Sequence, residues 1–157
     1  MAEENPNVLI IERVFDAPRE RVFRAWADPE EFSKWYGPNG FTIPVCEMDF
    51  RVGGSFHYCM RSENGFEFWL GGVYKEIVPD DIIVFTNYMA DEEGNPVSTG
   101  KADWPDETIV RVTFEDTQGK TKLTLRHEGM PPSEDRDRAG QGYNQTFDRL
   151  AAHLNEG

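Results

Sequence analysis

Two kinds of hydrophobic periodicity divide the chain. Over residues 55–61, 107–115 and 121–128, apolar side chains alternate with polar ones, which is typical of β-strands with one buried face. Between residues 143 and 154 the apolar positions recur every three or four residues, and this spacing predicts an amphipathic helix. The pattern therefore indicates a sheet followed by a long C-terminal helix.

Further strands are marked by β-branched and aromatic runs between turn residues. They are expected at 8–15, 42–50, 66–78 and 82–89, which brings the sheet to about seven strands. All but one of the connections are short turns, so we expect an antiparallel meander. The runs 66–78 and 82–89 are apolar on both faces, and the pattern leaves their register open.

Two short helices are predicted between the first two strands. Pro18 suits the start of one helix, and Asp28 followed by Pro29 suits the start of the next, with Asp28 as the N-cap. Glu31 is placed to complete a capping box with Asp28. Ser133 is expected to cap the long C-terminal helix. The predicted fold is α+β: a curved antiparallel sheet of about seven strands, two short helices and a long C-terminal helix.

Length and charge narrow the function classes. A chain of 157 residues suits one domain, here 1–157. Sixteen Lys and Arg against 29 Asp and Glu give a net charge of −13, which disfavours nucleic acid and anionic membranes as partners. No apolar run approaches the ~20 residues of a membrane helix. The acidic N-terminus does not resemble a secretory signal and there are only two cysteines, so we expect a cytoplasmic protein.

Seven short motifs occur along the chain in the order of a known family. They are Ala17-Pro18, Asp28-Pro29-Glu30, Trp35-Tyr36-Gly37-Pro38, Asp49-Phe50-Arg51-Val52-Gly53-Gly54, Glu76-Ile77-Val78-Pro79, Thr121-Lys122-Leu123-Thr124-Leu125 and Gly142-Tyr143-Asn144-Gln145-Thr146-Phe147-Asp148-Arg149-Leu150. With them the chain resembles the SRPBCC superfamily, also called START-like or Bet v-like. Within it, the chain is similar to homologues of the activator of the ninety-kilodalton heat-shock chaperone ATPase. The resemblance implies the helix-grip fold, whose members bind hydrophobic small molecules between the C-terminal helix and the sheet, cyclise polyketides or stimulate the chaperone.

The alternation places one set of side chains on the inward face of the sheet, under the C-terminal helix. We expect these residues to line a ligand cavity, with Trp69 and Phe85 added from the strands of open register: Phe56, Tyr58, Met60, Phe114, His127, Tyr143 and Phe147. The expected ligand is hydrophobic or aromatic, with one polar group that His127 or Tyr58 addresses. Ordinary core packing of the same aromatic residues is the alternative.

Candidate catalytic and metal-binding groups are few. His127 is the one histidine on the inward face, and it becomes a candidate acid or base if a carboxylate or hydroxyl partner lies within reach. His57 is expected on the outer face and His153 near the exposed end of the last helix. No metal, nucleotide or other cofactor motif occurs. Cys46 and Cys59 are predicted to lie on opposite faces of a hairpin and not to form a disulfide.

These observations favour a single-domain protein that binds a small hydrophobic or aromatic ligand without catalysis. Two alternatives remain open at this point. One is a protein-interaction module that contacts a chaperone through its acidic surface. The other is a cyclase-type or hydrolase-type enzyme that uses His127.

Overall fold

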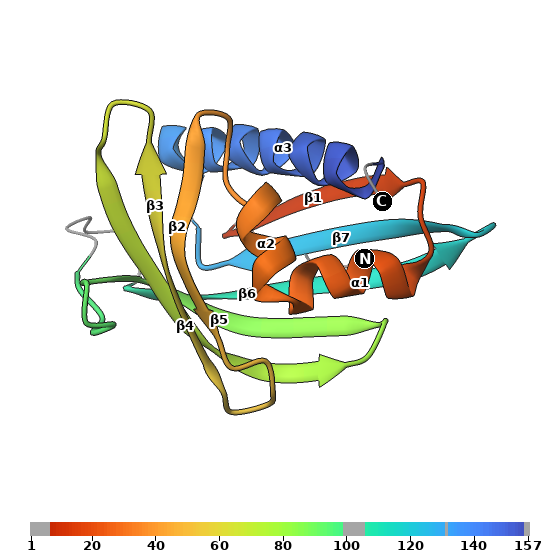
Figure 1. Ribbon diagram of the computed structural model, residues 1–157, viewed down its shortest axis with the longest axis horizontal. Helices are drawn as coiled ribbons and strands as arrows, with labels where there is room; N and C mark the ends of the chain where they lie inside the picture. The colour runs from red at the N-terminus through yellow and green to blue at the C-terminus, as the bar shows by residue number, and fades with distance from the viewer. Residues whose placement is uncertain (1–6, 99–105, 131, 156–157) are drawn as a thin grey trace.

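The computed structural model describes residues 7–98, 106–130 and 132–155. This part of the chain forms seven strands and three helices, drawn in Figure 1. In chain order they are β1 (Val8–Phe15), α1 (Arg19–Ala27), α2 (Pro29–Trp35), β2 (Phe41–Met48), β3 (Ser55–Ser62), β4 (Glu67–Val78), β5 (Ile82–Ala90), β6 (Glu107–Thr117), β7 (Lys120–Glu128) and α3 (Glu134–Asn155). The predicted α+β class and the long C-terminal helix are confirmed. No helix among the described residues is long and apolar enough to cross a membrane.

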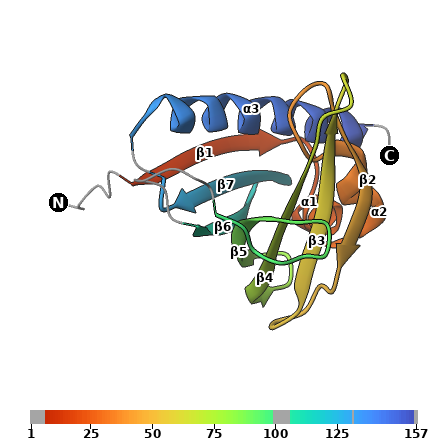
Figure 2. The same cartoon turned by 90° about the vertical axis from the view of Figure 1, so that its left-hand side faces the viewer.

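The sheet is antiparallel throughout, with the strand order β1-β7-β6-β5-β4-β3-β2. Strands β2 to β7 form the expected meander. β1 departs from it, because it pairs with β7 at the far edge instead of with β2. The sheet curls, and α1, α2 and α3 all lie on its concave side (Figures 1 and 2). The space between α3 and the strands is therefore the region in which a cavity can form.

Strand register settles which side chains face the helices. Tyr58 pairs with Leu70 and Met60 with Phe68, so these four residues share the concave face. Cys59 pairs with Trp69 on the convex face. Further along β4, a register shift between Tyr74 and Glu76 changes which residues point inward. Because of this bulge, Ile77, which pairs with Ile83, packs against the core on the same side as Tyr74.

The two cysteines lie on opposite faces of the β2–β3 hairpin, as predicted. Cys46 pairs with Tyr58 and therefore points to the concave side, whereas Cys59 pairs with Val45 on the convex side. Both thiols are free.

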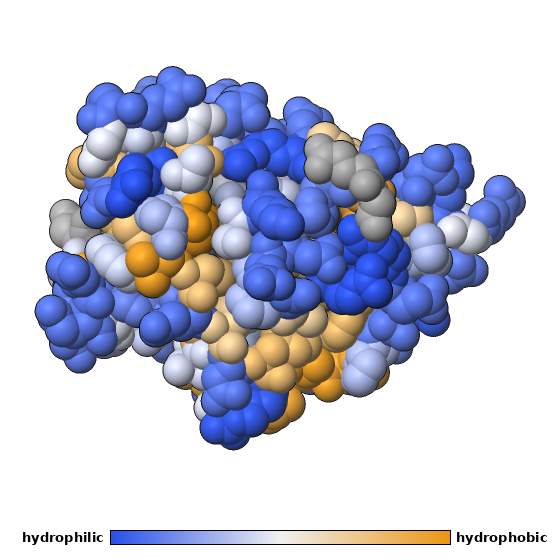
Figure 3. Space-filling view, in the orientation of Figure 1, coloured by the Kyte–Doolittle hydropathy of each residue, from blue (hydrophilic) through white to orange (hydrophobic). Residues whose placement is uncertain are grey.

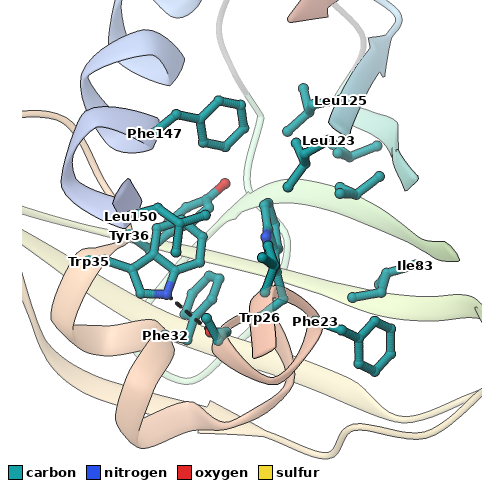
Figure 4. Packing of buried hydrophobic residues seen from close by; sticks show 14 of the residues in the cluster. Phe23, Trp26, Phe32, Trp35, Tyr36, Ile83, Leu123, Leu125, Phe147 and Leu150 are labelled. Atoms are coloured by element: carbon teal, nitrogen blue, oxygen red, sulfur yellow. Dashed lines mark hydrogen bonds between the residues drawn. The ribbon is translucent and has the colours of Figure 1, made fainter. Parts of the chain in front are cut away.

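Aromatic side chains from all three helices meet the sheet in one core (Figure 4). Trp26 of α1 lies against Trp35 of α2, with ring centroids 5.1 Å apart, and against Phe147 of α3 at 6.4 Å. The Trp35 indole nitrogen donates a hydrogen bond to the Ala25 carbonyl at 3.0 Å, which satisfies a polar group inside this apolar region. The packing fixes the three helices relative to one another.

Glu31 holds the same helices together at the surface. It does not complete a capping box; instead its carboxylate accepts hydrogen bonds from Arg21 at 2.7 Å, Arg24 at 3.1 Å and His153 at 2.9 Å. Burial acts to raise the pKa of Glu31, but the hydrogen bonds from His153 and Arg21 outweigh it and hold the pKa below its ordinary value. His153 is consequently paired with α2 rather than solvent-exposed as expected, its side chain being only 13% accessible.

The N-cap of α2 provides a first test of this architecture. The Asp28 carboxylate accepts a hydrogen bond from the Glu30 amide at 2.9 Å, as the sequence predicts. We expect Asp28→Ala to lower the free energy of unfolding by about 1 kcal/mol, because one helix-end amide loses its partner. Asp28→Asn keeps an acceptor at the same place and should stay close to the wild type. Equal losses in both variants, measured by urea unfolding, would contradict a capping role.

Candidate functional site

A pocket of about 480 Å³ opens to solvent between α3 and the concave face of the sheet. Its walls come from the end of α2 and the loop after it, from strands β3, β4, β5 and β7, and from the first half of α3. The lining includes Tyr36, Gly37, Pro38, Tyr58, Met60, Phe68, Leu70, Asn87, His127, Met130, Arg138, Ala139, Gly142, Tyr143 and Thr146. The volume falls within the range of ~300–1,000 Å³ that is typical of small-molecule sites.

The structure brings four of the nine expected lining residues together in this pocket: Tyr58, Met60, His127 and Tyr143. Phe56 and Phe85 also face inward, but they border a separate inner void of about 20 Å³. Phe114 and Phe147 lie in the aromatic core instead. Trp26 of α1 and Phe32 of α2 pack against this part of the concave face and border the inner void.

Trp69 lies outside the pocket. Its pairing with Cys59 places it on the convex face, where it stacks on His57 with ring centroids 4.6 Å apart. His57 itself lies on that outer face, as predicted, and its Nε2 is 3.0 Å from the Asp91 carbonyl oxygen. The neighbouring residues Phe68 and Leu70 take the inward positions on β4.

The inner void adjoins the one buried side-chain N–H that lacks an acceptor among the described residues, the indole nitrogen of Trp26. A void of about 20 Å³ has room for about one water-sized group and no more. The remaining lining of the void is mostly aromatic, including Phe32, Phe50 and Tyr74. The void is therefore too small for a ligand, which leaves the larger pocket as the candidate site.

A polar network crosses the floor of the larger pocket. The Nδ1 atom of His127 lies 2.9 Å from the Tyr143 hydroxyl, and its Nε2 atom lies 2.7 Å from the Thr108 hydroxyl. The Thr108 hydroxyl in turn donates to the Asn87 carbonyl at 3.3 Å. On the other side, the ring of Tyr36 lies against that of Tyr58, with ring centroids 5.9 Å apart. The hydrogen bonds of His127 and Thr108 connect three strands with α3.

The network is uncharged at neutral pH. Burial lowers the pKa of His127 from 6.5 to about 4, since a charged imidazolium would lose its hydration there. Burial also raises the pKa of Tyr36 to about 12 and raises the pKa values of Tyr58 and Tyr143 well above the ordinary value. The floor therefore offers hydrogen-bonding groups without a formal charge.

Among the residues that shape the site and were missed in the sequence analysis are Tyr36, Asn87 and Arg149. Tyr36 follows Phe32 and Trp35 at helical spacing, so periodicity could have indicated that it faces inward. Asn87 lies in β5, whose register the pattern left open. Arg149 gave no such signal; its guanidinium donates to the carbonyls of Gly37 and Pro38 at 2.8 and 3.0 Å and so fixes one lip of the pocket.

The site combines apolar walls with a few polar side chains that can form hydrogen bonds. Both ring nitrogens of His127 contact hydroxyl groups, which supplies the hydroxyl partner considered for catalysis. No cluster of three or more His, Cys, Asp or Glu suited to a metal ion occurs in the described part of the chain.

Comparison with known proteins supports the architecture. Protein CV1439 from Chromobacterium violaceum is 31% identical, with a TM-score of 0.81 over 96% of this chain and 98% of that one. At lower identity, two further structures share the fold. NE0264 from Nitrosomonas europaea is 21% identical, with a TM-score of 0.81 over 98% of this chain and 97% of that one. The AHSA1 protein SPO3351 from Silicibacter pomeroyi is 24% identical, with a TM-score of 0.78 over 94% and 97% of the respective chains.

No curated protein matches the sequence significantly. The model of one protein family does match, over residues 16–155, and its description is "Activator of Hsp90 ATPase homolog 1-like protein". This range contains all the elements from α1 to α3 and every residue of the pocket. The chain therefore belongs to the family of Activator of Hsp90 ATPase homolog 1-like proteins, as the sequence motifs predicted.

Proposed function

We propose that this protein binds a small, predominantly hydrophobic or aromatic ligand in the pocket between α3 and the sheet. The observation that carries the proposal is the pocket of about 480 Å³, in which apolar side chains surround an uncharged polar floor. Such a combination is typical of sites in which apolar contacts supply affinity and a few polar groups fix orientation.

The apolar part of the wall comes mainly from Met60, Phe68, Leu70 and Met130. Water in contact with this wall is released when an apolar ligand enters, and each square ångström of apolar area removed from water contributes roughly 25 cal/mol. Methionine side chains adapt to ligands of different shape, because they are flexible and polarizable. These features favour an apolar ligand over a strongly charged one.

The outer surface differs from this wall in character. Most of the face shown in Figure 3 is hydrophilic, interrupted by hydrophobic areas toward the left and the lower edge. The net charge of −13 gives the protein an acidic exterior. A negative exterior disfavours anionic ligands at long range, which agrees with an uncharged ligand.

Filling the pocket tests the proposal. Ala139 lies on α3 and lines the pocket, so we expect Ala139→Trp to occupy the space and to weaken the binding of a hydrophobic dye at least tenfold. Ala152 lies on the same helix and is exposed, which makes Ala152→Trp a matched control with unchanged binding. Dye titration with thermal unfolding of each variant measures both effects. If the dye binds all three proteins equally, it binds elsewhere and the proposal fails.

An enzymatic role has one observation in its favour, the contacts of His127 with the hydroxyls of Tyr143 and Thr108. A base with a pKa of about 4 takes up protons weakly at neutral pH, so the geometry supports binding better than catalysis. Conversion of a bound compound that stops in His127→Ala, with binding retained, would favour the enzyme instead.

A further inference from the structure

Two hydroxyl groups at the pocket donate hydrogen bonds to backbone carbonyls of the protein itself. Thr146 on α3 donates to the Gly142 carbonyl at 2.8 Å, one turn earlier in the helix. Thr108, just behind the pocket wall on β6, donates to the Asn87 carbonyl at 3.3 Å. A carbonyl oxygen can only accept, so the direction of both hydrogen bonds is fixed.

The Thr108 bond determines which nitrogen of His127 carries the proton. Because the single Thr108 proton is donated to Asn87, the Thr108 oxygen must accept from His127, whose Nε2 lies 2.7 Å away. Neutral imidazole has one N–H, so Nδ1 is then an acceptor, and Tyr143 donates to it at 2.9 Å. The opposite tautomer would leave two oxygen atoms, those of Thr108 and Asn87, in contact without a proton between them.

The two hydroxyls of α3 that line the pocket therefore both have their protons engaged within the protein. Tyr143 donates to His127, and Thr146 donates to the Gly142 carbonyl. Lone pairs remain available on both oxygens, so this part of the pocket accepts hydrogen bonds. The hydroxyls of Tyr36 and Tyr58 can donate or accept and so serve either kind of ligand.

Two other polar side chains of the pocket, Arg138 and Asn87, do not offset these hydrogen-bond acceptors. Arg138 lies at the mouth, where its side chain is 66% accessible and pairs with Glu134 at 3.5 Å. The amide of Asn87 carries both a donor and an acceptor, so it serves either kind of ligand.

From this polarity we infer that the pocket selects apolar ligands that carry a hydroxyl or N–H donor over ligands of the same shape that carry only an acceptor. The inference rests on the proposed function and specifies the ligand class. An acceptor-only ligand would place its lone pairs against those of Tyr143 and Thr146 and leave its desolvated oxygen unpaired.

Matched probes test the selection. 2-Naphthol, 2-methoxynaphthalene and naphthalene share one apolar body and differ in whether they donate, only accept or do neither. We expect calorimetric titration to show that 2-naphthol binds the wild type about three- to tenfold more tightly than its methyl ether, the ratio that one net hydrogen bond supplies.

One substitution should remove the preference without touching the pocket wall. Thr108→Val deletes the hydroxyl that fixes the His127 tautomer, so His127 is expected to carry its proton on Nδ1 and donate to Tyr143. One tyrosine proton then becomes available to the ligand, and the naphthol preference falls below about twofold. Thr113→Val makes the same change on the outer face of β6 and should retain the wild-type ratio.

Nitrogen-detected NMR of His127 reads the tautomer directly, a property that a merely structural effect would not change. We expect protonated Nε2 in the wild type and in Thr113→Val, and protonated Nδ1 in Thr108→Val. A wild-type Nδ1–H, or equal binding of naphthol and its ether, overturns the inference and leaves ligand binding intact. If none of the three probes binds the wild type, the proposed function fails and the inference fails with it.

Discussion

Replacement of Phe147 by alanine is expected to lower the free energy of unfolding by about 3 to 5 kcal/mol, the range for buried aromatic residues. Phe147 is fully buried on α3 and meets Phe15 of β1 and Trp26 of α1, with ring centroids 5.9 and 6.4 Å apart. Its loss leaves a cavity at the point where the first strand, the first helix and the last helix join. Neighbouring rings held in the same core cannot collapse fully into that space.

Phe66 provides the matched control, because it is 62% exposed in the turn region before β4. Phe66→Ala should change the free energy of unfolding by no more than about 0.5 kcal/mol. Denaturant unfolding of both variants and the wild type measures the difference. Similar losses at the two positions would show that α3 does not pack as described.

Acidification is expected to destabilise the protein through His127. The folded-state pKa is about 4 and the unfolded value is 6.5, so the unfolded chain binds the proton more readily. The contribution of His127 to the free energy of unfolding is therefore fully present above pH 6.5 and is lost as the pH falls toward 4. The loss amounts to about 3 kcal/mol, since one pKa unit corresponds to about 1.4 kcal/mol.

The variant His127→Gln isolates this effect because glutamine does not titrate. Its free energy of unfolding should differ from that of the wild type by an amount that changes by about 3 kcal/mol between pH 7 and pH 4. The paired carboxylate of Glu31 also loses its contribution at low pH, but it does so in both proteins and cancels from the difference. Parallel pH profiles would mean that His127 is accessible to water.

The sequence pattern predicted the strands well where one face of the strand is buried and the other is exposed to solvent. In β3, β6 and β7 strict alternation assigns each side chain to a face, and Tyr58, Met60 and His127 lie where the alternation places them. The helical spacing of α3 likewise placed Tyr143 at the pocket. These positions were predictable because the periodicity of apolar residues in the sequence matches the face of the strand or helix that is buried.

The remainder of the site depends on contacts that no local pattern encodes. The bulge in β4 reverses the alternation after Tyr74. Earlier in the strand, the pairing of Trp69 with Cys59 places its ring on the convex face. Whether an inward aromatic residue borders a pocket or a filled core depends on where α1 and α2 lie. Phe114 and Phe147 pack against Trp26 of α1, whereas Tyr58 and Tyr143 border the pocket.

The pairing of β1 with β7 has a consequence for how the chain is assembled during synthesis. β1 leaves the ribosome first, yet its hydrogen-bonding partner, residues Thr121 to Glu128, is made almost last. Strands β2 to β5 can join in sequence through short connections while β1 waits with one edge open. We therefore expect the pairing of β1 with β7, and the docking of α3 on β1, to follow the joining of the other strands.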